Sequence, residues 1–153
     1  MQNTFHITVA AIIKSNDHYL MVVDNTDTGY KLNQPAGHVE DQESIIDAVI
    51  RETKEECGFD FIPTHLVGIY MYKLKEHHTY LRFCFKGTYS GNIKHPMPRY
   101  NDDGVIEAKW YTLEQIKTKP LRSELVLKCI DDYEKGNAYD LSIIAEYKDL
   151  SNK

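Results

Sequence analysis

A helical pattern between residues 43 and 57 is the strongest structural signal in this sequence. Apolar or small side chains recur there at intervals of three and four residues, which is the period of an α-helix with one buried face. They are Ile46, Val49, Ile50, Thr53 and Cys57. Gly58 follows directly, and glycine often ends a helix because it adopts the left-handed conformation easily. We therefore predict a helix over residues 43–57.

Short β-branched and apolar runs surround this helix and predict strands. The expected strands are residues 5–13, 19–23, 66–74, 80–89 and 108–112, and residues 30–40 are expected to form a short strand that passes into a loop with proline and glycine. Polar residues 15–17 predict that the first two strands form a hairpin, and Ser123 offers the N-cap of a second helix that ends at Gly136. This order predicts an α/β fold, a mixed β-sheet sandwiched between α-helices as an α/β/α sandwich. The length of 153 residues suits one domain, residues 1–153.

Charge and composition exclude several classes of partner. A formal net charge of −5 argues against a broad basic surface, so we do not expect nucleic acid as a partner. The N-terminal apolar stretch is too short to span a membrane or to serve as a signal peptide. Cys57, Cys84 and Cys129 form no paired motif, and we expect buried thiols in a reducing cytoplasm. The chain is expected to be a monomer or a small homo-oligomer.

Three carboxylates crowd one face of the predicted helix. Glu52, Glu55 and Glu56 fall within an arc of about 100° on an ideal helix. One interpretation is a solvated acidic surface, which is the usual role of a charge cluster on a helix. The other is a site for Mg²⁺, which takes oxygen ligands and is often shared with substrate phosphates. The helix alone does not decide between them.

The residues around this acidic face resemble a known family motif. Its pattern is Gly37, five residues, Glu43, seven residues, Arg51-Glu52, two residues, Glu55-Glu56, one residue, Gly58 and Phe59. This stretch, residues 37–59, is similar to the Nudix box of the Nudix hydrolase family, with Thr53 as a mild departure where the family usually has an aliphatic residue. The resemblance implies the Nudix fold and an enzyme that cleaves phosphate–phosphate bonds.

The resemblance also implies a metal site and catalytic residues. Glu52, Glu55 and Glu56 would bind Mg²⁺, with Mn²⁺ as a possible substitute, and the backbone carbonyl of Gly37 would add a ligand. Arg51 lies four residues before Glu55 and eight after Glu43, so its expected role is to orient carboxylates through hydrogen bonds rather than to form an ordinary surface ion pair.

The general base is expected to be either a glutamate of the motif or an acid from a distant loop. Glu52 and Glu55 are favoured, and the loop candidates are Asp102, Asp103 and Glu107. A carboxylate close to the attacking water can take its proton. The sequence leaves the choice among these residues open.

Further stretches resemble one branch of the family, the NudJ-type phosphatases. They include residues 33–38, 81–83 and 121–126, and the similarity extends over roughly residues 5–141. The branch acts on thiamin pyrophosphate, hydroxymethylpyrimidine pyrophosphate and nucleoside di- and triphosphates. The resemblance therefore implies a small phosphoanhydride as the substrate. Alternatives are a Nudix hydrolase of nucleotide-sugars or dinucleoside polyphosphates, and a Nudix module that binds a ligand without catalysis.

Three residues outside the acidic face are candidates for binding that substrate. Arg82 alternates with Leu81 and Phe83 in a strand, so it points away from their apolar layer and could reach a phosphate, although a surface arginine would fit the same pattern. Arg122 precedes a helix start, where anions are favoured. His38, beside the acidic motif, is the third candidate.

Overall fold

Nine strands divide between two sheets in the computed structural model, which describes residues 2–74, 76–94, 96 and 104–151. The first sheet has the order β5 (Ala36–His38), β1 (Thr4–Ile12), β7 (His78–Ser90), β6 (Asp60–Lys73) and β9 (Tyr139–Asp140). The second contains β2 (Lys14–Ser15), β3 (His18–Thr26), β4 (Gly29–Asn33) and β8 (Val105–Thr112). The helices are α1 (Ile45–Cys57), α2 (Leu113–Lys117) and α3 (Leu125–Glu134), followed by the 3₁₀ turn η1 (Leu141–Ile143).

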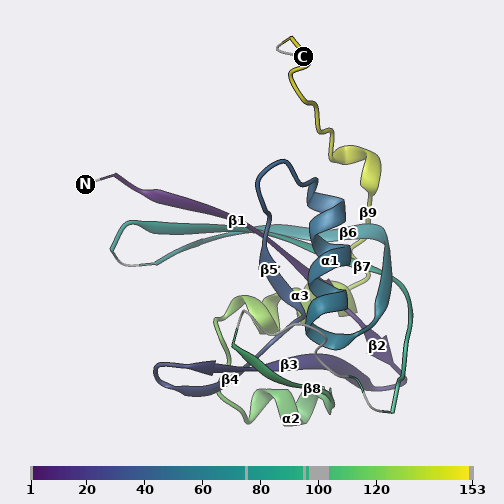
Figure 1. Ribbon diagram of the computed structural model, residues 1–153. Helices are drawn as coiled ribbons and strands as arrows, with labels where there is room; N and C mark the ends of the chain where they lie inside the picture. The colour runs from purple at the N-terminus through teal and green to yellow at the C-terminus, as the bar shows by residue number, and fades with distance from the viewer. Residues whose placement is uncertain (1, 75, 95, 97–103, 152–153) are drawn as a thin grey trace.

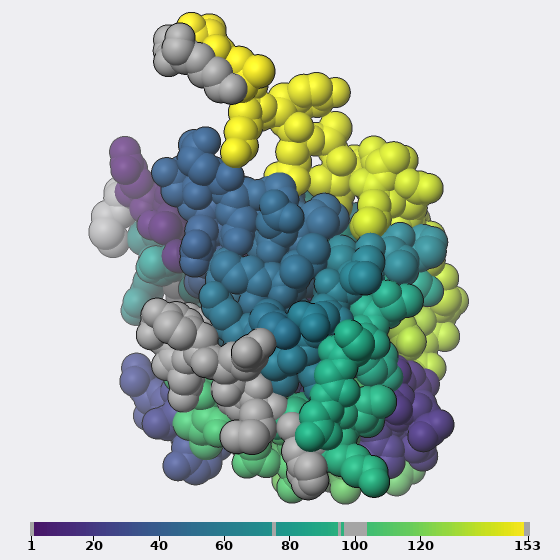
Figure 2. Space-filling model, turned by 45° about the vertical axis from the view of Figure 1, so that its right-hand side comes forward, coloured from purple at the N-terminus to yellow at the C-terminus, as the bar shows by residue number. Residues whose placement is uncertain are grey.

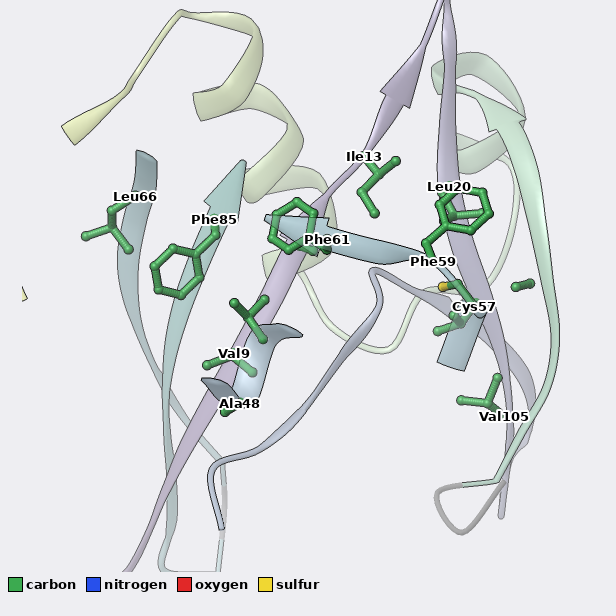
Figure 3. Close-up of a cluster of buried hydrophobic side chains, with 14 residues drawn as sticks. Val9, Ile13, Leu20, Ala48, Cys57, Phe59, Phe61, Leu66, Phe85 and Val105 are labelled. Carbon is green, nitrogen blue, oxygen red and sulfur yellow. The ribbon is translucent and has the colours of Figure 1, made fainter. Parts of the chain in front are cut away.

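The first sheet is mixed and lies between two helices. Strand β1 pairs in parallel with β7 and antiparallel with β5, while β6 and β7 form a long antiparallel hairpin. On one face, Val9, Ala11 and Phe85 pack with Ala48 and Val49 of α1 in a continuous apolar core (Figure 3). On the other face, a second core joins Ala10, Ile12 and Cys84 to Val126, Cys129 and Ile130 of α3. The predicted α/β class is confirmed (Figure 1).

The predicted hairpin around residues 15–17 forms only in part. Residues Lys14 and Ser15 pair with β3 across that turn, but β1 itself belongs to the other sheet. The reason is burial, because residues 9–13 are all almost fully buried and such a strand needs cover on both faces. The five-residue helix α2 was not predicted, since it is too short to give a clear helical period.

Helix α1 starts two residues later than predicted and stops at the predicted glycine. The hydroxyl of Ser44 accepts a hydrogen bond from the Asp47 N–H at 3.0 Å, which makes Ser44 the N-cap. The carboxylate of Glu146 accepts a further bond from the Ile45 N–H, so the C-terminal segment reaches this helix end before it stands away from the body (Figure 2). At the other end Gly58 has φ 76° and donates to the Lys54 carbonyl at 2.9 Å.

Among the described helices, none is long and apolar enough to span a membrane.

Replacing Gly58 tests whether the left-handed turn fixes the end of α1. Gly58→Ala is expected to lower the free energy of unfolding by about 1–2 kcal/mol, because a side chain in the left-handed conformation is strained. Gly58→Asn is the matched control and should lose less, since asparagine tolerates this conformation better. Urea unfolding of the three proteins measures the difference, and equal stability of both variants would contradict the assignment.

Candidate active site

Gly37 lies directly against the carboxylate of Glu52. Strand β5 carries Gly37 beside Val9 of β1 and contacts helix α1. A methyl group placed on Gly37 would overlap all three atoms of the Glu52 carboxylate. Glu52 is only 4% exposed. Glycine is therefore required at this position if the carboxylate is to keep its place.

Glu56 lies one helical turn beyond Glu52 and faces the same strand. Its Oε1 accepts a hydrogen bond from the Ala36 N–H at 2.8 Å, and the residue is 3% exposed. Two buried carboxylates of α1 thus flank the Ala36–Gly37 backbone. Burial of ionised groups is costly unless they are hydrogen-bonded or balanced by opposite charge. Glu56 is hydrogen-bonded to the Ala36 N–H, and Glu52 accepts a hydrogen bond from Arg51.

Arg51 contacts four glutamates and one backbone carbonyl. Its Nε and Nη2 donate to the Glu43 carboxylate at 2.7 and 2.9 Å, and Nη1 donates to Glu52 at 2.7 Å and to Glu55 at 3.2 Å. Nη2 also donates to the His38 carbonyl at 3.0 Å, and Glu40 lies 3.4 Å from Nη1. Arg51 therefore ties the acidic face of α1 to the segment that leads into it.

The Arg51–Glu43 pair fixes the charge states of both residues. Hydrogen bonds to Glu43 and then to Glu52 raise the pKa of Arg51 well above its ordinary value, although burial opposes this. The hydrogen bond from Arg51 is the largest cause that lowers the pKa of Glu43. The pair is bidentate, which is the strongest geometry for an arginine and a carboxylate.

A cavity of about 400 Å³ opens beside this acidic face. Its walls combine acids, arginines, small residues and aromatic side chains. The lining residues are Thr8, Asp24, Asn33, Ala36, Gly37, His38, Glu40, Glu52, Glu56, Tyr72, Leu74, Tyr80, Arg82, Arg122, Ser123 and Leu125. Of the predicted site residues, Gly37, His38, Glu52, Glu56, Arg82 and Arg122 are in this wall. Glu55 is outside the wall and turns to Arg51.

Arg82 is a buried cation rather than a surface arginine. It is 7% exposed, and its Nη1 and Nη2 donate to the amide oxygens of Gln34 and Asn33 at 2.9 and 3.0 Å. These partners are neutral, so they orient the guanidinium without cancelling its charge. Within the described part of the chain, no carboxylate comes within ion-pair distance of Arg82. Its charge is therefore available to an anion in the cavity.

Arg122 also lines the cavity. Its Nε lies 3.6 Å from the Oδ2 of Asp24, a buried residue of β3 that was not among the predicted site residues. The N-cap of α3 is Glu124, one residue after the predicted Ser123. The Ser123 hydroxyl still accepts a hydrogen bond from the Leu125 N–H at 3.2 Å. Asn33, Gln34 and Asp24 were missed as partners because they lie far from the arginines in sequence and are joined only by the fold.

Of the three acids predicted as loop candidates for the general base, only Glu107 lies in the described part of the chain. Asp102 and Asp103 lie outside the described residues. Glu107 is exposed on β8 opposite Val23 and is not among the residues that line the cavity. No described feature brings Glu107 to Glu52 or Glu56.

The donor set fits a hard divalent cation that keeps part of its water shell. Across the described residues, no three His, Cys, Asp or Glu side chains form a closed metal-binding group. Glu52 and Glu56 instead form an open pair of carboxylates, and the absent side chain of Gly37 leaves the backbone close to Glu52. Mg²⁺ is commonly bound by one or two carboxylates together with water and substrate phosphates. The residues present therefore suit such an ion.

Comparison with known proteins identifies relatives over nearly the whole chain. The NUDIX domain family matches residues 4–129. Proteins named Phosphatase NudJ are 33% identical in Shigella boydii and 32% identical in Escherichia coli K12, over 145 residues that cover 93% of this chain and 92% of each relative. A solved NUDIX hydrolase from Nitrosomonas europaea superimposes with a TM-score of 0.84 at 40% identity, covering 94% of this chain and 98% of that one. The predicted Nudix fold and the resemblance to NudJ-type phosphatases are confirmed.

The Arg51–Glu43 pair predicts a pH-dependent loss of stability. Glu43→Gln should lower the free energy of unfolding at neutral pH by about 1–2 kcal/mol, because one charge-assisted bond is lost. The pKa of Glu43 is lower in the folded state, so its contribution is complete above the ordinary value of 4.5 and disappears as the pH falls through the folded-state value. The gap between wild type and variant should therefore close on acidification, down to the lowest pH at which both still unfold cooperatively.

Urea unfolding at a series of pH values measures this gap. Asp60→Asn is the matched control, since the exposed ion pair of Asp60 with Lys54 is expected to contribute less than about 1 kcal/mol. A gap for Glu43→Gln that stays constant or widens at acidic pH would show that Glu43 does not stabilise the fold as an ionised partner of Arg51.

Proposed function

The chain belongs to the Nudix hydrolase family, and on that premise we propose that it uses Mg²⁺ to hydrolyse phosphate–phosphate bonds in small ring-bearing diphosphates and nucleotides. It is an enzyme of the pyrophosphohydrolase type, with relatives among the NudJ-type phosphatases. The proposed substrates are thiamin pyrophosphate, hydroxymethylpyrimidine pyrophosphate and nucleoside di- and triphosphates, and Mn²⁺ is a proposed substitute for Mg²⁺. The observation that carries this proposal is the pair of buried carboxylates, Glu52 and Glu56, at the wall of a cavity that also contains Arg82.

The metal is assigned to the acidic face of α1. Hydrolases of this family generally use divalent metal ions. The proposed ligands are Glu52 and Glu56, with Glu55 and the carbonyl of Gly37 as further ligands. A bound dication would supply charge neutralisation of the phosphates and a more acidic water. Arg51 holds Glu52 and Glu55 in place for this role through its hydrogen bonds.

The phosphates of the substrate are assigned to the two arginines. Arg82 is oriented by two amide oxygens and keeps its charge, so it can form charge-assisted hydrogen bonds to phosphate oxygens. Arg122 lines the same cavity with its side chain 46% exposed, which leaves it room to turn toward a bound anion. His38 lines the same wall and is the third proposed contact.

The general base is proposed to be Glu52 or Glu55. Both are held by the same Nη1 of Arg51, so either carboxylate has a fixed position from which to accept a proton from an attacking water. Glu52 has the advantage that it lines the cavity. The loop acids Asp102 and Asp103 stay as alternatives, while the exposed position of Glu107 makes it the weakest of the three.

The cysteines support a reducing compartment, and we propose the cytoplasm. Cys57, Cys84 and Cys129 are all free thiols and all buried. Burial raises the pKa of the Cys57 and Cys84 thiols, which keeps them protonated and poorly reactive.

A glutamate exchange tests the metal assignment. Glu56→Gln is expected to lower kcat/KM with Mg²⁺ by roughly 100-fold or more, because a metal ligand supplies several kcal/mol of transition-state stabilisation. The fold should persist, since the Gln side chain can still accept the hydrogen bond from the Ala36 N–H. Glu114→Gln, on the exposed side of α2, is the control and should retain wild-type turnover. Wild-type rates in Glu56→Gln would refute the assignment.

The products distinguish the proposed substrates from other substrate classes. The assay uses thiamin pyrophosphate, hydroxymethylpyrimidine pyrophosphate, nucleoside triphosphates and a nucleotide-sugar, with the products separated by chromatography. Release of orthophosphate from thiamin pyrophosphate is the expected result. Preferential cleavage of the nucleotide-sugar to a nucleoside monophosphate and a sugar phosphate would contradict it.

A further inference from the structure

The cavity has an aromatic end that belongs to neither apolar core. Tyr72, Leu74 and Tyr80 line it, and none of these three packs in the two clusters that hold the described helices against the sheet. They lie where the β6–β7 hairpin and the start of β1 project past the helices (Figure 1). Apolar side chains that face a cavity instead of a core are available to a ligand.

Two other tyrosines of the same sheet, Tyr70 and Tyr89, have a structural role in the core. Tyr70 is buried, and its hydroxyl donates to Asp132 at 2.7 Å. Tyr89 packs against the core, and its hydroxyl donates to the Lys14 carbonyl at 3.0 Å. Each of these rings is part of a core and has a fixed polar partner. Tyr80 is different, because its ring is only half-buried and forms part of the cavity wall.

The ring of Tyr80 stacks against the ring of His6. The two rings are stacked with centroids 4.3 Å apart and planes inclined by 10°. His6 is fixed in turn, since Nε2 shares a hydrogen bond with Nδ1 of His78 at 2.9 Å and Nδ1 shares one with Nε2 of His38 at 3.2 Å. The orientation of Tyr80 is therefore set before a ligand arrives.

Strand register relates this ring to the cation of the cavity. One cross-strand row contains His6, Tyr80 and Tyr72. The next row on the same face of the sheet contains Thr8, Arg82 and Tyr70. Residues two positions apart in a strand are separated by about 7 Å. A planar ring on Tyr80 would therefore place its phosphate groups near Arg82, in the cavity whose wall also includes Glu52.

We propose that Tyr80, backed by His6, is the platform on which the aromatic ring of the substrate stacks, so that this end of the cavity selects diphosphates joined to a planar ring over ringless ones. The inference rests on the proposed function for the phosphate end of the same cavity. The shared chemistry of the ligand is a flat aromatic ring, whether a pyrimidine, a purine or the rings of thiamin. Tyr80 is the residue in contact with the ring, and His6 is a positioning residue that acts through Tyr80.

Binding of two matched probes tests the platform independently of turnover. The probes are the α,β-methylene analogue of ADP, which carries a ring, and methylenediphosphonate, which does not, each titrated calorimetrically with Mg²⁺ present. The wild-type protein should prefer the ring-bearing probe. Tyr80→Leu should reduce that preference by roughly 5- to 100-fold, the range that a lost stacking contact covers. Tyr80→Phe, which keeps the ring, should stay within about twofold of the wild-type preference.

Two further variants separate stacking from a general structural effect. His6→Ala should reduce the preference, and His6→Phe should restore most of it, because phenylalanine can stack on Tyr80 without the histidine hydrogen bonds. Tyr30→Leu is the matched control, since Tyr30 is 62% exposed on β4 and lies outside the cavity wall. Its preference should equal that of the wild type.

The outcomes separate this inference from the proposed function. A wild-type protein without preference for the ring, or equal losses for both probes in Tyr80→Leu, would overturn the platform. Steady-state kinetics on thiamin pyrophosphate and on inorganic triphosphate then address turnover, where Tyr80→Leu should raise KM for thiamin pyrophosphate far more than it lowers kcat. Ring preference in binding without any hydrolysis would refute the proposed function and support the platform.

Discussion

Arg51 is the residue on which the geometry of the acidic site depends. Helix α1 presents Glu52, Glu55 and Glu56 within little more than one turn, and like charges at this spacing destabilise a helix. The guanidinium resolves part of that conflict by contacting Glu43, Glu52, Glu55 and Glu40 at once. Among the described residues, this network brings one guanidinium to four carboxylates. A divalent cation beside Glu52 would add positive charge to this face, and the position of the Glu52 carboxylate leaves no room for a side chain on Gly37.

Strand pairing in the first sheet sets the positions of the other cavity residues, Arg82 and Tyr80. Strand β1 carries Thr8 beside Arg82 and His6 beside Tyr80 on one face of the sheet, so alternate positions along this strand lead from the cation to the aromatic ring. Gly37, which contacts Glu52, pairs with Val9 of the same strand. This order matches a substrate in which a ring is joined to a chain of phosphates. The parallel pairing of β1 with β7 is what brings Thr8 and His6 next to Arg82 and Tyr80, over 70 residues later in the chain.

Local features of this site could be predicted from the sequence, and its long-range contacts could not. The helix, its glycine stop and its acidic face depend on periodicity within about 15 residues, and they are found where the pattern indicated, apart from the first two residues. The helical pattern did not predict that Glu52 and Glu56 line the cavity while Glu55 lies outside its wall and contacts Arg51. That difference depends on where strand β5 lies. Arg82 fitted a surface residue equally well until the fold brought Asn33 and Gln34 to it. The partners of Arg122 and Tyr80 depend on strand pairings of the same kind.

Calorimetric titration of Mn²⁺ into the wild-type protein and into Gly37→Ala tests the metal site most directly. We expect the wild type to bind the ion. Gly37→Ala, with the same fold by circular dichroism, should bind it at least about tenfold more weakly, because the added methyl group displaces the Glu52 carboxylate. Absence of binding by the wild type, alone or with methylenediphosphonate, would contradict the claim that these carboxylates are arranged around a dication. Unchanged affinity in Gly37→Ala would contradict the role given to the close approach of Gly37 and Glu52.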